Sequence, residues 1–279
     1  MQMQKGKTIE FWNEFHTQES AKEWILKPSE ALFEAIPLHG RVLEIGCGTS
    51  HLSRDLYCHY KESCTVVATD VSAVCIKSNQ KRDEALLAMS QGRFSYQVLD
   101  ALQSNPELMD SSNVILDKGC LDTFLFRSGH QVSEQLVKTL LDNVHRWLKD
   151  NGKYIVFTPR RRLKLLRDYA GFASVQRTAL DESSNVVLGD LDGDSGNDTV
   201  YMYVCEKDRS YTPGNGIAFR DGYDLAFKGE KHTCSSCSMT FQDFCNGEDM
   251  NGKRIKYWTR RWRGHCVHCR VQPSGDSSL

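Results

Sequence analysis

The sequence predicts an α/β fold in which a mostly parallel, seven-stranded β-sheet carries helices on both faces. From Arg41 onward, short apolar runs alternate with longer segments of helical periodicity, which is the pattern of parallel strands joined by helices. Two further β-like runs near residue 200 flank a turn-rich segment and predict an antiparallel pair. With 279 residues, 40% of them hydrophobic, the chain is long enough for one sizeable core and a small appendage.

Each predicted strand is a short apolar run. The five parallel strands are expected at 41–45, 65–69, 94–99, 113–116 and 153–157, and the antiparallel pair at 174–179 and 199–205. Before the fifth strand, residues 132–148 place apolar side chains on one helical stripe, and the Asn-Gly pair at 151–152 is expected to end that helix. The basic residues 160–164 are expected to begin another helix. Residues 181–198, rich in Asp, Ser, Gly and Asn, predict a long loop.

Charge and hydropathy exclude several classes of protein. Lys and Arg number 35 against 36 Asp and Glu, a net charge of -1, so the chain as a whole is not a polyanion binder. No apolar run approaches the roughly 20 residues that span a bilayer. The first residues lack the apolar core of a secretory signal, so we expect a cytoplasmic protein with no membrane partner, with the nucleus as the alternative. Most of the 11 cysteines are scattered singly and are expected to be reduced.

A glycine turn follows the first predicted strand. The motif LEIGCGTS at 43–50 places Gly46 and Gly48 between that strand and the next helix. Glycine permits a tight turn and a close approach of the backbone to a ligand, because no Cβ intervenes. A packing role for the two glycines is the alternative. Taken with the strand–turn–helix context, the motif predicts one wall of a ligand site.

Acidic residues stand at the ends of the next three strands, as Asp70, Asp100 and Asp117. The carboxyl ends of parallel strands meet at one edge of a sheet, where ligands bind. Asp70 can accept hydrogen bonds from ribose hydroxyls, or it can cap the helix that begins near Ser72. A dinucleotide site would normally add a third glycine for the pyrophosphate, but His51 stands at that position, so the pattern favours a nucleoside cofactor without phosphates.

With these features, residues 8–207 resemble the class I S-adenosylmethionine-dependent methyltransferases, which have a Rossmann-like seven-stranded sheet. The resemblance implies that the glycine turn lies beside the methionine part of the cofactor, that Asp70 holds the ribose and that Asp100 lies near the adenine. The cofactor-binding residues it implies are Trp12, Trp24, Glu44, Gly46, Gly48, Asp70, Val71, Asp100, Ala101 and Lys118.

The fourth strand narrows the resemblance. The run DKGCLD at 117–122 is similar to the DKGTLD signature of small eukaryotic protein-lysine methyltransferases that act on elongation factor 1-alpha and citrate synthase, with Cys120 in place of Thr. It implies that Asp117 faces the reacting centre as the catalytic residue, orienting the amine more than acting as a base. It also implies that Leu121 and Asp122 support the loop. For both aspartates, helix capping is the alternative.

The aromatic N-terminal residues resemble that family's segment that folds across the cofactor. They are FWNEF at 11–15 and the pair Glu23-Trp24. We therefore expect residues 1–40 to be a helical cover belonging to a methyltransferase domain of residues 1–210. Plain core packing is the alternative for both tryptophans.

The cysteine-containing tail, residues 211–279, is expected to be a zinc-ribbon-like module. Two pairs with two intervening residues each, separated by 28 residues, can present four thiolates to one structural Zn²⁺: Cys234, Cys237, Cys266 and Cys269. Coincidental core thiols are the alternative. Between the pairs, KRIKYWTRRWR at 253–263 has six basic and three aromatic residues, which suit either RNA contact or a small core beneath the metal.

The sequence thus predicts an S-adenosylmethionine-dependent methyltransferase with a macromolecular substrate, and the resemblance favours the lysine side chain of a protein. One alternative is an RNA methyltransferase that grips RNA with its basic zinc tail. Another is a catalytically inactive, cofactor-binding adaptor.

Overall fold

The computed structural model describes residues 9–18, 23–36, 38–61, 63–125, 134–161, 163–180 and 200–214. Nearly all of them belong to one compact unit, made of residues 1–124 and 135–223. The four cysteines of the expected zinc module and the expected loop at 181–198 lie outside the described residues.

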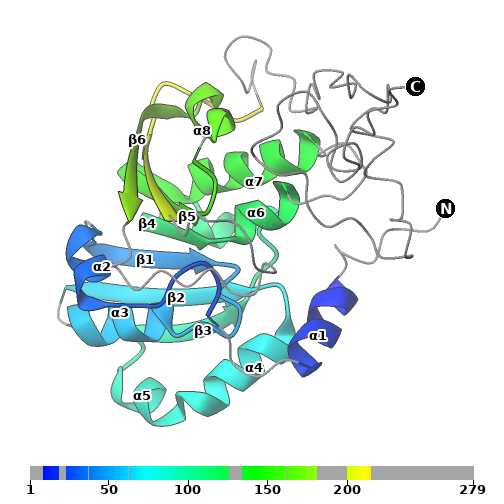
Figure 1. Cartoon of the computed structure of the whole chain (residues 1–279), viewed down its shortest axis with the longest axis vertical. Helices are drawn as coiled ribbons and strands as arrows, with labels where there is room; N and C mark the ends of the chain where they lie inside the picture. The colour runs from blue at the N-terminus through cyan, green and yellow to red at the C-terminus, as the bar shows by residue number, and fades with distance from the viewer. Residues whose placement is uncertain are drawn as a thin grey trace, which may run out of the picture. The chain divides into compact units, whose positions relative to one another are not determined.

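The core of this unit is a seven-stranded sheet with the strand order β3-β2-β1-β4-β5-β7-β6 (Figure 1). β1 to β5 run parallel, and β7 is antiparallel to both β5 and β6. The strands are β1 Gly40–Ile45, β2 Cys64–Asp70, β3 Phe94–Val98, β4 Ser112–Lys118, β5 Leu148–Thr158, β6 Phe172–Leu180 and β7 Val200–Lys207. The predicted Rossmann-like, mostly parallel sheet is confirmed.

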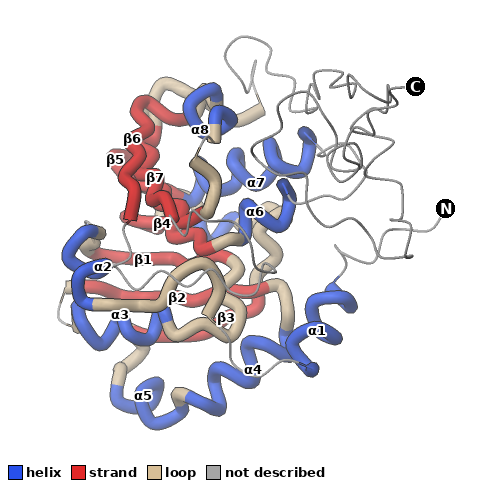
Figure 2. Tube along the Cα trace, viewed as in Figure 1, coloured by secondary structure: helices blue, strands red, loops and turns tan. Residues whose placement is uncertain are grey.

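Helices connect the strands and cover the sheet (Figure 2). They are α1 Ile9–Gln18, α2 Glu30–Ala35, α3 Leu52–Tyr60, α4 Ala73–Arg82, α5 Glu84–Met89, η1 Pro106–Leu108, α6 Cys120–Leu125, α7 Glu134–Trp147 and α8 Lys164–Asp168. Among the described residues, no helix has the length and apolar character needed to cross a membrane.

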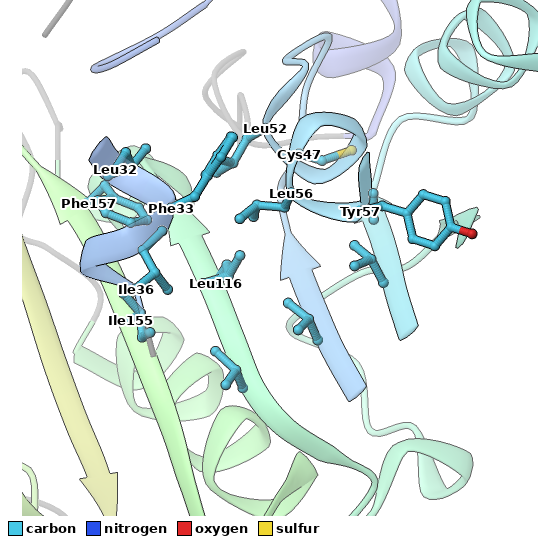
Figure 3. Packing of buried hydrophobic residues seen from close by; sticks show 14 of the residues in the cluster. Leu32, Phe33, Ile36, Cys47, Leu52, Leu56, Tyr57, Leu116, Ile155 and Phe157 are labelled. Atoms are coloured by element: carbon cyan, nitrogen blue, oxygen red, sulfur yellow. The ribbon is translucent and has the colours of Figure 1, made fainter. Parts of the chain in front are cut away.

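One face of the sheet packs against α2 and α3. Figure 3 shows Leu32 of α2, Ile36 directly after it, and Leu52 and Leu56 of α3 directed toward strand residues that include Leu116, and all five are buried. Alternate strand residues point to opposite faces, so the neighbours of these strand residues serve the other face. Buried side chains therefore line both faces, as expected for a parallel sheet between two helical layers.

The end of α7 differs from the sequence prediction. The helix stops at Trp147 and β5 begins at once with Leu148, so the Asn-Gly pair does not end the helix. Ser112 pairs with Leu148, whereas Val114 pairs with Lys153, and this register shift leaves extra residues in β5. Asn151 takes a left-handed φ of 61°, which asparagine tolerates well. The pair therefore forms a bulge inside the strand.

The predicted helix at 160–164 also begins later, at Lys164. The Arg160 amide donates to Thr158 Oγ1 at 3.1 Å, and the hydroxyl of Tyr203 donates to the Arg161 carbonyl at 2.8 Å. The same hydroxyl accepts from the Leu163 amide at 3.1 Å. These bonds to β5 and β7 hold the connection in a non-helical conformation.

Candidate active site

A cavity opens at the carboxyl edge of the sheet, where α1, the glycine turn and the ends of β2 and β4 meet. Nine of the ten predicted cofactor-binding residues line it: Trp12, Trp24, Gly46, Gly48, Asp70, Val71, Asp100, Ala101 and Lys118. Its other lining residues include Phe15 and Cys120, which belong to the motifs FWNEF and DKGCLD, and His16 and Thr123, which the sequence did not single out. Glu44 and Asp117 are not among the lining residues.

Strand register explains which residues reach the cavity. Ile45 pairs with Thr69 on one side and with Asp117 on the other. The next residues along these three strands are Gly46, Asp70 and Lys118, and all three line the cavity. These three lining residues therefore stand one position beyond the last row in which β1 pairs with β2 and β4.

The two glycines of the turn are required for different reasons. Gly46 and Gly48 have left-handed φ values of +62° and +52°. A Cβ on Gly46 would lie 2.8 Å from the Cβ of Cys120, closer than atoms can pack. Among the described residues, a Cβ on Gly48 would meet only His16, at 3.8 Å, and because both residues line the cavity it would take space from a ligand.

Asp70 holds this turn in place. One carboxylate oxygen accepts from the Gly48 amide at 2.9 Å, and the other accepts from the Ser72 amide at 2.8 Å. The cap of α4 is Ser72 itself, whose hydroxyl accepts from the Cys75 amide. Each carboxylate oxygen can accept a second bond, so Asp70 keeps acceptor capacity for hydroxyl groups in the cavity.

The carbonyls of the turn are bonded as well. The Asn79 side chain donates to the Gly48 carbonyl at 2.7 Å, and Arg82 donates to the Thr49 carbonyl at 2.9 Å. Arg82 is itself fixed by Asp83 at 2.8 Å. The turn thus has its shape before any ligand arrives, which lowers the entropic cost of binding.

An aromatic wall closes the other side of the cavity. Phe15 lies edge-on to Trp12 and to Trp24, with ring centroids 5.7 Å apart in both pairs. Asn13 of the same helix accepts from the Ser72 hydroxyl at 2.8 Å and so ties α1 to α4, beside which it lies in Figure 1. Trp24 remains 41% exposed, so the core-packing alternative does not describe it.

Glu23 connects the N-terminal segment to the rest of the site, a role that sequence reasoning missed. Its carboxylate accepts from the Ser50 hydroxyl at 2.7 Å, the His51 amide at 2.6 Å and the Lys118 ammonium at 3.1 Å. Burial alone would raise the pKa of Glu23, but these charged and polar partners outweigh it and lower the pKa. The carboxylate is therefore ionised at neutral pH.

Lys118 lines the cavity, as expected, but its charge is already paired. Its ammonium donates to Glu23 and to the Trp24 carbonyl at 3.0 Å, and only 3% of its side chain is exposed. Lys118 therefore anchors the N-terminal cover to β4.

The expectation that Asp117 faces the reacting centre is not met by its placement. β4 continues to Lys118, so Asp117 lies inside the strand and points to the opposite face, where it is fully buried. It accepts from the Tyr154 hydroxyl at 2.7 Å and from the Leu121 amide at 3.0 Å. The second bond is to an amide in the first turn of α6, as the helix-capping alternative predicts. Burial and, to a smaller extent, the neighbouring Asp122 raise its pKa to about 7.

Glu44, also predicted to bind the cofactor, is not among the residues that line the cavity. The side chain is buried, and the Ser53 hydroxyl donates to it. Burial raises the pKa of Glu44 to about 7. Asp122 behaves as expected, since it supports the segment after β4 through an ion pair with Arg160 at 2.7 Å.

The sheet order and the cavity define a class. The glycine turn and Asp70 line the cavity, while the donors at the start of α3 are already used, since the His51 amide bonds to Glu23 and the Leu52 amide to Ser50. A pyrophosphate would need those donors. The class is that of the class I S-adenosylmethionine-dependent methyltransferases. Residues 38–207 match the family described as "Methyltransferase domain", and the chain belongs to that family.

Relatives with known names share part of this chain. It is 33% identical over 155 residues to the "eEF1A lysine and N-terminal methyltransferase" of Bos taurus and 32% identical over 155 residues to that of Homo sapiens. It is 29% identical over 152 residues to the homolog of Drosophila melanogaster. Each match covers 52–53% of this chain and 21% of the relative, so the chain spans about a fifth of the length of these relatives.

Proposed function

We propose that this chain transfers a methyl group from S-adenosylmethionine to an amino group of a protein substrate, above all a lysine side chain. The observation that carries the proposal is the identity of 33% to a relative named as a lysine and N-terminal methyltransferase. The run DKGCLD at 117–122, which resembles the signature of protein-lysine methyltransferases, points to the same acceptor.

The cavity residues fit this cofactor. The space beside Gly48 admits a ligand, Asp70 has acceptor capacity for ribose hydroxyls, and Asp100 and Ala101, the residues expected beside the adenine, line the same cavity. The charge also suits a cation, because Asp70 and Asp100 face the cavity while the charge of Lys118 is paired with Glu23. When bound, the cofactor supplies an electrophilic methyl group on a positively charged sulfur.

The aromatic wall suits an amine substrate. A lysine must lose its proton before it can attack, and its ordinary pKa is about 10.4. The rings of Trp12, Phe15 and Trp24 make their side of the cavity apolar, and a less polar environment lowers the pKa of an amine. Asp117 does not line the cavity, but it accepts a hydrogen bond from the Leu121 amide and so fixes the start of α6. It is therefore a positioning residue in this proposal.

The acceptor is tested with radiolabelled methyl donor and cell extract that is untreated, protease-treated or ribonuclease-treated. We expect label that survives ribonuclease and is lost to protease, followed by mapping of the methyl group to a lysine Nε or a terminal amine by mass spectrometry. The Asp70→Ala variant serves as the site control. Label lost to ribonuclease supports the RNA alternative, and cofactor binding without turnover supports the inactive adaptor.

We also propose that residues 211–279 form a module in which Cys234, Cys237, Cys266 and Cys269 hold one structural Zn²⁺. The spacing of the two pairs supports this, because each pair can present two thiolates to a tetrahedral ion. Elemental analysis is expected to find one zinc per chain, with loss in a Cys234→Ser variant. The control is Cys58→Ser, which removes an exposed thiol of α3. Metal-free protein with a folded tail would contradict the proposal.

A further inference from the structure

The N-terminus of α3 is an anion site that the chain fills with its own carboxylate. α3 has nine residues and follows the first strand and the glycine turn, the position where dinucleotide-binding folds place a pyrophosphate. Here Glu23 Oε1 accepts from the His51 amide at 2.6 Å, and Oε2 accepts from the Ser50 hydroxyl at 2.7 Å and from the Lys118 ammonium at 3.1 Å.

These donors are the kinds that bind phosphates elsewhere. Backbone amides at a helix start, a hydroxyl group and a lysine ammonium together make up phosphate-binding loops. Glu23 engages all three kinds, and the Ser50 hydroxyl also accepts from the Leu52 amide at 3.0 Å. The ion pair is enclosed, with 3% of the Lys118 side chain and 13% of the Glu23 side chain exposed. A phosphate approaching this point would meet the negative charge of Glu23. The hydrogen-bond donors that could bind the phosphate already donate to that carboxylate.

We propose that Glu23 is a specificity-determining residue that excludes adenine nucleotides carrying 5′-phosphates from the cavity. The inference rests on the cofactor assignment above. In S-adenosylmethionine a sulfur replaces the 5′-oxygen that carries the phosphate of a nucleotide, so no phosphate competes with the carboxylate of Glu23. A phosphate must displace Glu23, and this breaks the bond to Lys118 and frees the segment that carries Trp24.

The contacts of Glu23 connect the rejection of phosphates with the position of the aromatic cover that carries Trp24. Trp24, the next residue, lines the cavity, and its carbonyl accepts from the same Lys118 ammonium at 3.0 Å. The bonds that seat the carboxylate therefore also hold the aromatic cover. Rejection of phosphates and retention of the cover follow from one set of contacts.

The test compares adenosine, ADP and S-adenosylhomocysteine by titration calorimetry on the full chain. Wild type is expected to bind S-adenosylhomocysteine and to bind ADP more weakly than adenosine. In Glu23→Ala, the affinity for ADP relative to adenosine should rise about tenfold or more, because a like charge has been removed from the phosphate position. Glu23→Gln, which keeps the shape and loses the charge, should give a smaller rise. Glu34→Ala removes an exposed carboxylate of α2 and should keep the wild-type ratio.

A double variant identifies the source of the new affinity. If Lys118 supplies the attraction, adding Lys118→Met to Glu23→Ala should abolish the gain for ADP. An unchanged ratio of ADP to adenosine affinity in both Glu23 variants, with wild-type circular dichroism in either, overturns the proposal. Wild-type protein that binds ADP as tightly as adenosine also overturns it. Failure of wild type to bind S-adenosylhomocysteine instead overturns the cofactor assignment, and the inference with it.

Discussion

The ends of β2 and β4 carry similar acidic residues in very different environments. Asp70 is the last residue of β2, lines the cavity and is held by two backbone amides. Asp117 is one residue short of the end of β4, points to the other face and is sealed against Tyr154. An acidic residue near a strand end therefore lines the cavity only when the length and register of the strand direct its side chain toward it.

The largest expected effect is at Asp70. Asp70→Ala removes the acceptor of the Gly48 and Ser72 amides together with the ribose partner, so affinity for S-adenosylhomocysteine should fall about a hundredfold, in line with the loss of two charged hydrogen bonds. Calorimetry measures the affinity, and Glu84→Ala, which changes an exposed acid of α5, is the control. Equal affinity in the Asp70 variant would show that the two strand ends do not differ as described.

A smaller effect is expected at Asp117, where it concerns stability and its pH dependence. The folded state raises the pKa of Asp117 from 3.8 to about 7, so it favours the protonated acid. The associated stability is fully present below pH 4 and is lost as pH rises through about 7. Asp117→Asn removes this loss and should be more stable than wild type by about 1–2 kcal/mol at pH 8, with little difference at pH 4.

Urea unfolding between pH 4 and pH 8 measures this difference. Glu44 titrates in the same window, because burial raises its pKa to about 7, so part of the pH slope should remain in the Asp117 variant. Asp117→Ala should lose turnover and retain cofactor affinity, whereas Asp117→Asn should keep most turnover because the amide can still accept from Leu121. Wild-type turnover in Asp117→Ala would rule out the positioning role.

The smallest effect is expected at Gly48. Alanine in its left-handed conformation costs about 1 kcal/mol of stability. Gly92 offers a matched control, since its φ is +81° and a Cβ there would meet nothing within 4 Å. Both alanine variants should lose similar stability in urea, but only Gly48→Ala should weaken binding of S-adenosylhomocysteine, by several-fold. Equal binding in the two variants would place the ligand elsewhere than beside the turn.

Local patterns in the sequence predicted the fold well, because apolar runs record burial directly. All seven strands occur where expected, with ends shifted by at most two residues, apart from β5, which begins five residues early. β4 extends to Lys118 because backbone pairing with β5 continues into polar residues that an apolar pattern does not mark. The two wrong helix boundaries, at 151–152 and at 160–164, were decided by the register of β4 and by Tyr203, contacts that are distant in sequence.

The residues of the site also divide into those that local sequence predicts and those that depend on partners distant in sequence. The places of Gly46, Gly48, Asp70 and Asp100 beside the cavity were predictable, because each lies at or just after a strand end and this needs no knowledge of its partners. The role of Glu23 was not, since Ser50 and Lys118 lie 27 and 95 residues away. The only local signal was its place beside Trp24. The side of β4 that Asp117 occupies follows from alternation, once the pairing of Ile45 with Asp117 is known.

The long-range bond between Glu23 and Lys118 bears on how the protein is made on the ribosome. A nascent chain exposes Glu23 and Ser50 well before β4 has been translated. Until Lys118 arrives, the carboxylate lacks its cationic partner and the N-terminal cover lacks its anchor to the central strand. Cofactor capture should therefore begin only after the chain has been synthesised at least as far as Lys118 and β4 has paired with β1.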